Sequence, residues 1–255
     1  MPWDRTKGRP EPIRALNRIK ESENGEPLVH LASGSPSVRI ARPTVIPYLR
    51  QTVAEMLETA ARRLPPGYHL GVVDAWRPFD RQVKIYKWLW ESLEKARPDL
   101  PYASKRRIVN RFVAPVDQPA PPGHTTGAAV DVWLFDPDNV EVDVTSPFER
   151  LAGAPTYVFG LEARAHQNRM ILVEAMLSAG FSNCRDEWWH YSYGDAGWAV
   201  RMDLQECFYG RIDLDPGIYA ENEAEWNEKL LSRVNPFLQE GAPAARRPKP
   251  NRSAG

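Results

Sequence analysis

A single carboxylate interrupts a stretch of sequence that is otherwise apolar. Residues 129–135 consist of alanine, valine, tryptophan, leucine and phenylalanine apart from Asp131, and this composition predicts a β-strand. A period of two places Asp131 on one face of that strand, together with Trp133 and Phe135. Burying a carboxylate there costs on the order of several kcal/mol unless the group is paired or binds a metal. Asp131 is therefore either a cap for neighbouring backbone or a metal ligand.

A turn precedes this strand and carries a histidine. Residues 121–123 are two prolines and a glycine, which cannot continue a helix. His124 follows them on the loop that enters the strand of Asp131. A histidine and an aspartate in these positions could bind one metal ion. The alternative is that His124 is an ordinary surface residue of the loop.

The composition limits the classes of protein to consider. The chain has 255 residues and a net charge of zero, and 26% of its residues are charged, so we expect neither nucleic acid nor an anionic membrane as a partner. A polar start without an apolar run predicts no signal peptide, and no apolar stretch approaches the roughly 20 residues of a membrane span. Two cysteines do not make a disulfide framework. We expect a cytoplasmic protein, and its oligomeric state is not predicted.

Hydrophobic periodicity predicts the remaining elements. Helices and strands alternate irregularly, which indicates an α+β domain with a small, mostly antiparallel sheet flanked by helices. We expect an irregular leader over residues 1–44 packed on the domain, a catalytic domain over 45–240, and a disordered tail over 241–255. The predicted helices span 46–64, 80–96, 104–112 and 164–179, and the predicted strands include 28–31 and 68–73.

Polar residues in apolar or turn settings form a larger constellation. His124, Asp131 and His190 are a normal three-ligand set for one catalytic Zn²⁺ per chain, with a fourth position left to water. Such a zinc lowers the pKa of water to roughly 7, and a nearby carboxylate can take the proton. Glu187 is the natural base, because it lies three residues from a ligand. Arg77 could stabilise the oxyanion that develops on the attacked carbonyl.

The spacing of Glu187 and His190 sets a geometric condition. In a regular strand these two side chains would face opposite ways. The site therefore requires that Glu187 precede the strand proper, or that the strand twist sharply. Cys184, nearby in sequence, is expected to be a small buried side chain, because a fourth protein ligand would leave no place for water.

Three motifs occur in the order Asp74-x-Trp76-Arg77-Pro78, His124-x-x-Gly127-x-Ala129-x-Asp131 and Glu187-Trp188-Trp189-His190. This order resembles the D-alanyl-D-alanine dipeptidases, a group of zinc peptidases related to the D,D-carboxypeptidases and to the hedgehog-type fold. The resemblance covers residues 45–215. It implies zinc binding by His124, Asp131 and His190, with Glu187 as base and Arg77 as the group that stabilises the tetrahedral intermediate.

Two positions depart from the family pattern. Members usually have a serine two residues before the first zinc histidine, where this chain has Pro122. The family segment that contains a substrate-binding aspartate appears here as residues 143–148 in altered form. The resemblance implies that Asp143 holds the substrate ammonium group, within a changed loop.

Three functions are compatible with these residues. The first is hydrolysis of a small D,D-dipeptide such as D-Ala-D-Ala by a metal-activated water. The second is a D,D-carboxypeptidase that trims peptidoglycan stem peptides. The third is a non-catalytic zinc-binding module that serves recognition.

Overall fold

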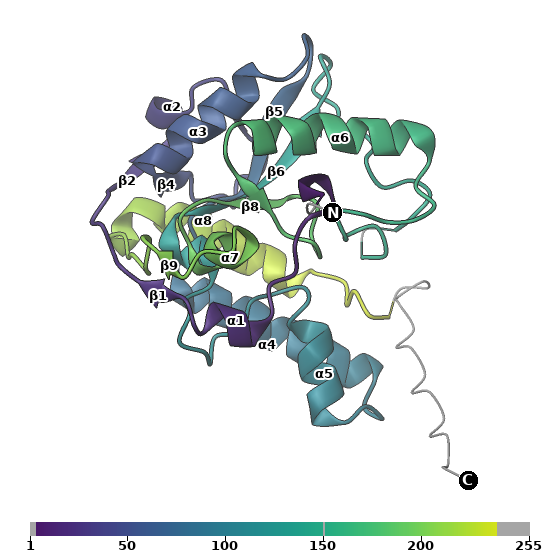
Figure 1. Cartoon of the computed structure of the whole chain (residues 1–255). Helices are drawn as coiled ribbons and strands as arrows, with labels where there is room; N and C mark the ends of the chain where they lie inside the picture. Colours follow the sequence, from purple (N-terminus) through teal and green to yellow (C-terminus); the bar gives the residue numbers. More distant parts are fainter. Residues whose placement is uncertain (1–3, 150, 239–255) are drawn as a thin grey trace.

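A five-stranded sheet lies at the centre of the computed structural model, which describes residues 4–149 and 151–238 (Figure 1). The strand order is β3-β5-β6-β8-β7, in which β3 runs parallel to β5 and every other neighbour is antiparallel. The expected α+β class and the mostly antiparallel sheet are confirmed. The strands are β3 (Arg39–Ile40), β5 (His69–Asp74), β6 (Ala129–Phe135), β8 (His190–Ser192) and β7 (Ser182–Asn183).

Two of the longer helices pack against the sheet, and two others lie below it in the view of Figure 1. In Figure 1, α3 (Gln51–Arg62) and α6 (Ala163–Ser178) lie at the top, and α4 (Phe79–Ala96) and α5 (Tyr102–Val109) lie at the bottom. The hydrophobic core lies between the sheet and the helices α3 and α6. Fully buried residues of this core include Leu70, Val72, Val130 and Val132 of the sheet, Val53 and Leu57 of α3, and Leu172 and Met176 of α6. The even-numbered residues of β6 point into this core, and Asp131 therefore points to the other face of the sheet.

The first predicted helix begins later than expected. We expected a helix over 46–64, but Tyr48–Arg50 form β4, which pairs antiparallel with β2 (Leu28–His30). The side chain of Arg50 is buried and donates hydrogen bonds to the carbonyl oxygens of Thr126 and Gly210. These long-range contacts override local helix propensity, so α3 starts only at Gln51.

The segment expected to be an irregular leader contains short elements. Helix α1 (Ile13–Leu16) and helix α2 (Leu31–Gly34) lie within it, and β3 adds an edge strand to the central sheet. Strand β1 (Lys20–Glu21) pairs in parallel with β9 (Glu206–Cys207). The division at residues 44 and 240 stays a prediction, and the expected tail over 241–255 lies outside the described residues.

Two helices near the end of the described chain were not predicted. Helix α7 (Ala196–Arg201) begins after Asp195, whose side chain accepts a hydrogen bond from the backbone of Trp198. Helix α8 (Pro216–Leu231) begins after Asp215, which caps the backbone of Gly217. An aspartate followed by proline is a start signal for a helix, so α8 was available to sequence reasoning. None of the helices in the described part of the chain has the length and apolarity to cross a membrane.

Candidate metal centre

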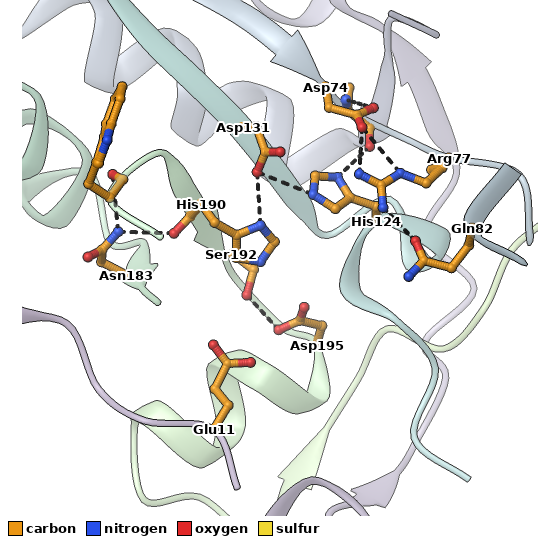
Figure 2. Close-up of polar contacts among 12 residues, drawn as sticks. Glu11, Asp74, Arg77, Gln82, His124, Asp131, Asn183, His190, Ser192 and Asp195 are labelled. Carbon is orange, nitrogen blue, oxygen red and sulfur yellow. Dashed lines mark hydrogen bonds and ion pairs between the residues drawn. The ribbon is translucent and has the colours of Figure 1, made fainter. Parts of the chain in front are cut away.

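Three elements bring the predicted ligands together. His124 lies on the 3₁₀ turn η2 (Gly123–Thr126), Asp131 on β6 and His190 at the start of β8. Asp131 Oδ1 lies 2.9 Å from His190 Nδ1 and 3.3 Å from His124 Nε2. Dashed lines mark both contacts in Figure 2. One potential ligand atom from each residue lies within 4.8 Å of the other two. Within the described ranges, this is the group of histidine, cysteine and carboxylate side chains that could hold a metal.

The backbone of Ala75 fixes the orientation of His124. The Nδ1 atom of His124 lies 2.8 Å from the carbonyl oxygen of Ala75, which can only accept a hydrogen bond. A proton on Nδ1 makes this hydrogen bond, so Nε2 is the ring nitrogen left to bind a metal. Metal-binding histidines are commonly oriented in this way by a hydrogen bond to the other ring nitrogen. Sequence reasoning could not find Ala75, because its contribution is a backbone carbonyl.

The three side chains are largely shielded from solvent. Exposed fractions are 8% for His124, 13% for Asp131 and 14% for His190. Burial alone would raise the pKa of Asp131, but the charges and hydrogen bonds of both histidines hold that pKa well below its usual range. An ionised carboxylate between two imidazoles is a donor set that zinc binds readily, so these residues fit the metal that the sequence implies.

The predicted base lines the same cleft as this group. Glu187 belongs to the loop between β7 and β8, and its carbonyl oxygen accepts a hydrogen bond from the backbone of His190 at 3.2 Å. It therefore precedes the strand proper, which satisfies the geometric condition set by its spacing from His190. A cleft of about 760 Å³ is lined by Glu187, the three potential ligands and Arg77.

Arg77 is held in place by two side chains. Its guanidinium donates to the Asp74 carboxylate at 2.6 and 3.2 Å and to the side-chain oxygen of Gln82 (Figure 2). Burial alone would lower the pKa of Arg77, but the carboxylates of Asp74, Asp131 and Glu187 raise it above its usual value. A cation that is always charged therefore faces the cleft, and Asp74 orients it. The role of Gln82 was missed, since nothing in its spacing relates it to Arg77.

The amino-acid sequence was compared with those of known protein families. A family model described as D-Ala-D-Ala dipeptidase matches residues 46–208, which is most of the chain. The chain belongs to the D-Ala-D-Ala dipeptidase family. It is thus a peptidase of the metallo type.

Two relatives agree with this assignment. A D-alanyl-D-alanine dipeptidase of Synechocystis is 27% identical over 198 residues, which cover 66% of this chain and 80% of the relative. A D-alanyl-D-alanine dipeptidase of Enterococcus faecalis is 28% identical over 134 residues, which cover 51% of this chain and 64% of the relative. The matched family region contains all six site residues predicted from the sequence.

Asp143 lies apart from the five other site residues predicted for this family member. It lines a neighbouring pocket of about 310 Å³ and is not among the described residues that line the larger cleft. Its Oδ1 atom accepts backbone hydrogen bonds from Thr145 and Ser146 at 2.9 and 3.0 Å. Trp133 and Glu149 line both cavities, so the two are adjacent.

Cys184 lines the large cleft but does not belong to the ligand group found in the described chain. Burial raises the pKa of its thiol well above the usual value, which disfavours the thiolate that a metal would require. The potential metal ligands of this dipeptidase family member are therefore two histidines and one carboxylate.

Proposed function

We propose that the protein hydrolyses D-Ala-D-Ala or a related D,D-dipeptide in the cytoplasm, with one zinc ion held by His124, Asp131 and His190. The observation that carries this proposal is the convergence of three potential ligand atoms within 4.8 Å in the cleft that Glu187 also lines. Bound zinc supplies Lewis acidity toward the scissile carbonyl and toward an attacking water.

Glu187 acts as the base in this scheme. Its carboxylate accepts a proton from the water as the oxygen forms a bond to the peptide carbon. When the carbon–nitrogen bond breaks, the same carboxyl group returns the proton to the leaving amine. The products are two free amino acids, and Glu187 ends as the carboxylate with which it began.

Arg77 stabilises charge that appears only during the reaction. Its guanidinium faces the cleft, fixed by Asp74 and Gln82. A fixed cation binds the developing oxyanion more strongly than the neutral carbonyl of the substrate, so it lowers the barrier rather than only improving binding.

Asp143 is the proposed partner of the substrate ammonium group. Its pocket adjoins the large cleft through Trp133 and Glu149. The side chain of Ser146 and the backbone nitrogens of Thr145 and Ser146 lower the pKa of the carboxyl group, so Asp143 is negatively charged at neutral pH. A substrate reaching from the metal group past Trp133 would bring its ammonium toward this carboxylate.

A substrate panel tests the proposed function. Protein depleted of metal by chelation is supplied with one equivalent of zinc, and D-alanine release is measured from D-Ala-D-Ala and from an acetyl-capped tripeptide that ends in D-Ala-D-Ala. We expect zinc-dependent hydrolysis of the free dipeptide and little of the capped peptide. Preference for the capped peptide would instead indicate a carboxypeptidase, and zinc binding without hydrolysis would indicate a recognition module.

A further inference from the structure

Glu187 and His190 lie on one β-hairpin, which comprises residues 182–192 and is called the Glu187 hairpin below. Ser182 of β7 is the register partner of Ser192 of β8, so these two serines form the base of the hairpin. The backbone nitrogen of Cys184 donates to the carbonyl oxygen of His190 at 3.2 Å near the other end. Whatever fixes this hairpin also fixes the proposed base and one potential metal ligand.

A buried cation bridges the base of the hairpin. Arg201 of α7 donates through Nε to the hydroxyl of Ser182 at 2.9 Å and through Nη2 to the hydroxyl of Ser192. Ser192 in turn donates to Asp195 at 2.6 Å. The Arg201 side chain is 1% exposed, and its ion-pair partner is Glu11, which comes from the leader. Figure 2 shows the Glu11 carboxylate below Ser192 and Asp195.

The leader also pairs with the edge of the hairpin. The backbone nitrogen of Arg9 donates to Asn183 at 3.3 Å, and the backbone nitrogen of Arg185 donates to the carbonyl oxygen of Arg9 at 3.2 Å. Arg9 and Cys184 therefore form an isolated parallel bridge, which places the leader backbone beside the end of β7. Arg185 lies two residues before Glu187. The leader therefore contacts the loop of Glu187 just after the end of β7.

The opposite side of this loop is also held. The backbone nitrogen of Thr156 donates to the carbonyl oxygen of Arg185 at 2.9 Å, and its hydroxyl donates to the carbonyl oxygen of Cys184 at 2.6 Å. The loop of Glu187 thus lies between Thr156 and the leader. Removing either neighbour would free one side of it.

Gly8 permits the close approach of the leader. Its φ is +66°, and a Cβ atom there would lie 2.7 Å from Arg185 Cα and 2.8 Å from the carbonyl oxygen of Cys184. Both atoms belong to backbone, which cannot move aside as a flexible side chain can. Any other residue at position 8 would push the leader away from the loop.

We propose that residues 8–11 are a positioning element of the active site, which holds the Glu187 hairpin in its reactive geometry. This inference rests on the proposed role of Glu187 as the base. A displacement of about 1 Å at a reacting group can cost about 100-fold in rate. The leader acts through backbone pairing at Arg9 and through the ion pair of Glu11 with Arg201.

A matched pair of glycine variants tests this inference. Gly8→Ala introduces a Cβ into the loop backbone, whereas Gly25→Ala changes another leader glycine with φ +76° and nothing within 4 Å of the added atom. Both variants carry similar backbone strain. We expect Gly8→Ala to lower kcat on the D,D-dipeptide by about tenfold or more, with KM and zinc content near wild type. Gly25→Ala should stay within about twofold of wild type.

Hydrogen exchange provides a readout that does not depend on the substrate. Amides of residues 184–190 should exchange faster in Gly8→Ala than in Gly25→Ala. If wild-type protein hydrolyses no D,D-dipeptide, this difference still supports the positioning element, while the proposed function fails. Equal kcat and equal exchange in the two variants would overturn the inference.

A second pair covers the case in which Gly8→Ala does not fold. Glu11→Gln keeps the size of the side chain but leaves Arg201 without its leader carboxylate. Its control is Glu206→Gln, which removes an exposed ion pair between Lys20 of the leader and β9. We expect lower kcat and faster exchange at residues 184–190 for Glu11→Gln alone. Identical behaviour of these two variants would also contradict the proposal.

Discussion

Asp131 and His190 are register partners on neighbouring antiparallel strands, and Asp131 Oδ1 lies 2.9 Å from His190 Nδ1. Directly opposite residues in such a pair have their Cβ atoms about 5 Å apart on the same face. The sheet therefore brings two potential ligands together by its register alone. The third, His124, is aimed at them by the carbonyl oxygen of Ala75.

Replacing one ligand should weaken zinc binding strongly. We expect wild-type protein to bind about one zinc per chain and His124→Ala to lose affinity by about 100-fold or more, since even outer partners of metal ligands contribute 10- to 100-fold. Competition against a chromophoric chelator measures this. His166→Ala, which alters an exposed histidine of α6, is the control. Equal zinc affinity in the two variants would remove His124 from the site.

Replacing Arg77 should slow turnover more than it weakens substrate binding. Arg77→Ala should raise the barrier by roughly 2 to 4 kcal/mol, because stabilisation of the oxyanion is lost. Arg77→Lys should have a smaller effect, since lysine keeps the charge but loses the planar fork that contacts Asp74 and Gln82. Both kcat and melting temperature are measured on one preparation, with the exposed Arg107→Ala as control. A lower melting temperature with unchanged kcat would show that Arg77 only pins the turn.

The charge of Asp143 should matter for substrate binding. Asp143→Asn keeps an oxygen that can accept from Thr145 and Ser146 but removes the charge proposed to bind the ammonium group. We expect KM to rise about tenfold or more and kcat to change less. Asp136→Asn is a matched control, because Asp136 also caps backbone, at Val140. If both variants kept wild-type KM, Asp143 would serve the loop alone.

Arg169 should be important for stability. This buried residue of α6 donates hydrogen bonds to backbone carbonyl groups within residues 144–156, so Arg169→Met should lower the free energy of unfolding by about 3 kcal/mol or more. Urea denaturation measures the loss, with the exposed Arg164→Met as control; equal midpoints would contradict this role. The accepting carbonyl groups are those of Val144, Gly153, Pro155 and Thr156.

The local pattern of apolar residues correctly predicted those helices and strands in which the apolar residues are also the buried ones. The strand over 129–135 and the helices over 80–96 and 164–179 match β6, α4 and α6 to within one residue at each end, because apolar periodicity and burial coincide there. Asp131 was recognised because it interrupts an apolar strand. Residue types and family motifs also identified the six candidate site residues, five of which line the same cleft.

The remainder depends on contacts that no local window contains. Tyr48–Arg50 became a strand through pairing with Leu28–His30, about twenty positions earlier. The ion pair of Glu11 with Arg201 joins residues 190 positions apart, so spacing could not reveal it. Backbone groups such as the carbonyl of Ala75 carry no sequence signature at all.

The central claim is that Glu187 acts as the base and is not a metal ligand, and the variant Glu187→Gln tests it most directly. Zinc content and kcat are measured for Glu187→Gln, beside the control Asp186→Asn at the neighbouring carboxylate. We expect Glu187→Gln to keep about one zinc per chain and to lose kcat by about 100-fold or more, because the amide cannot accept the proton. Loss of zinc with unchanged turnover per bound metal would make Glu187 a ligand, and full kcat with full zinc would contradict its role as the base.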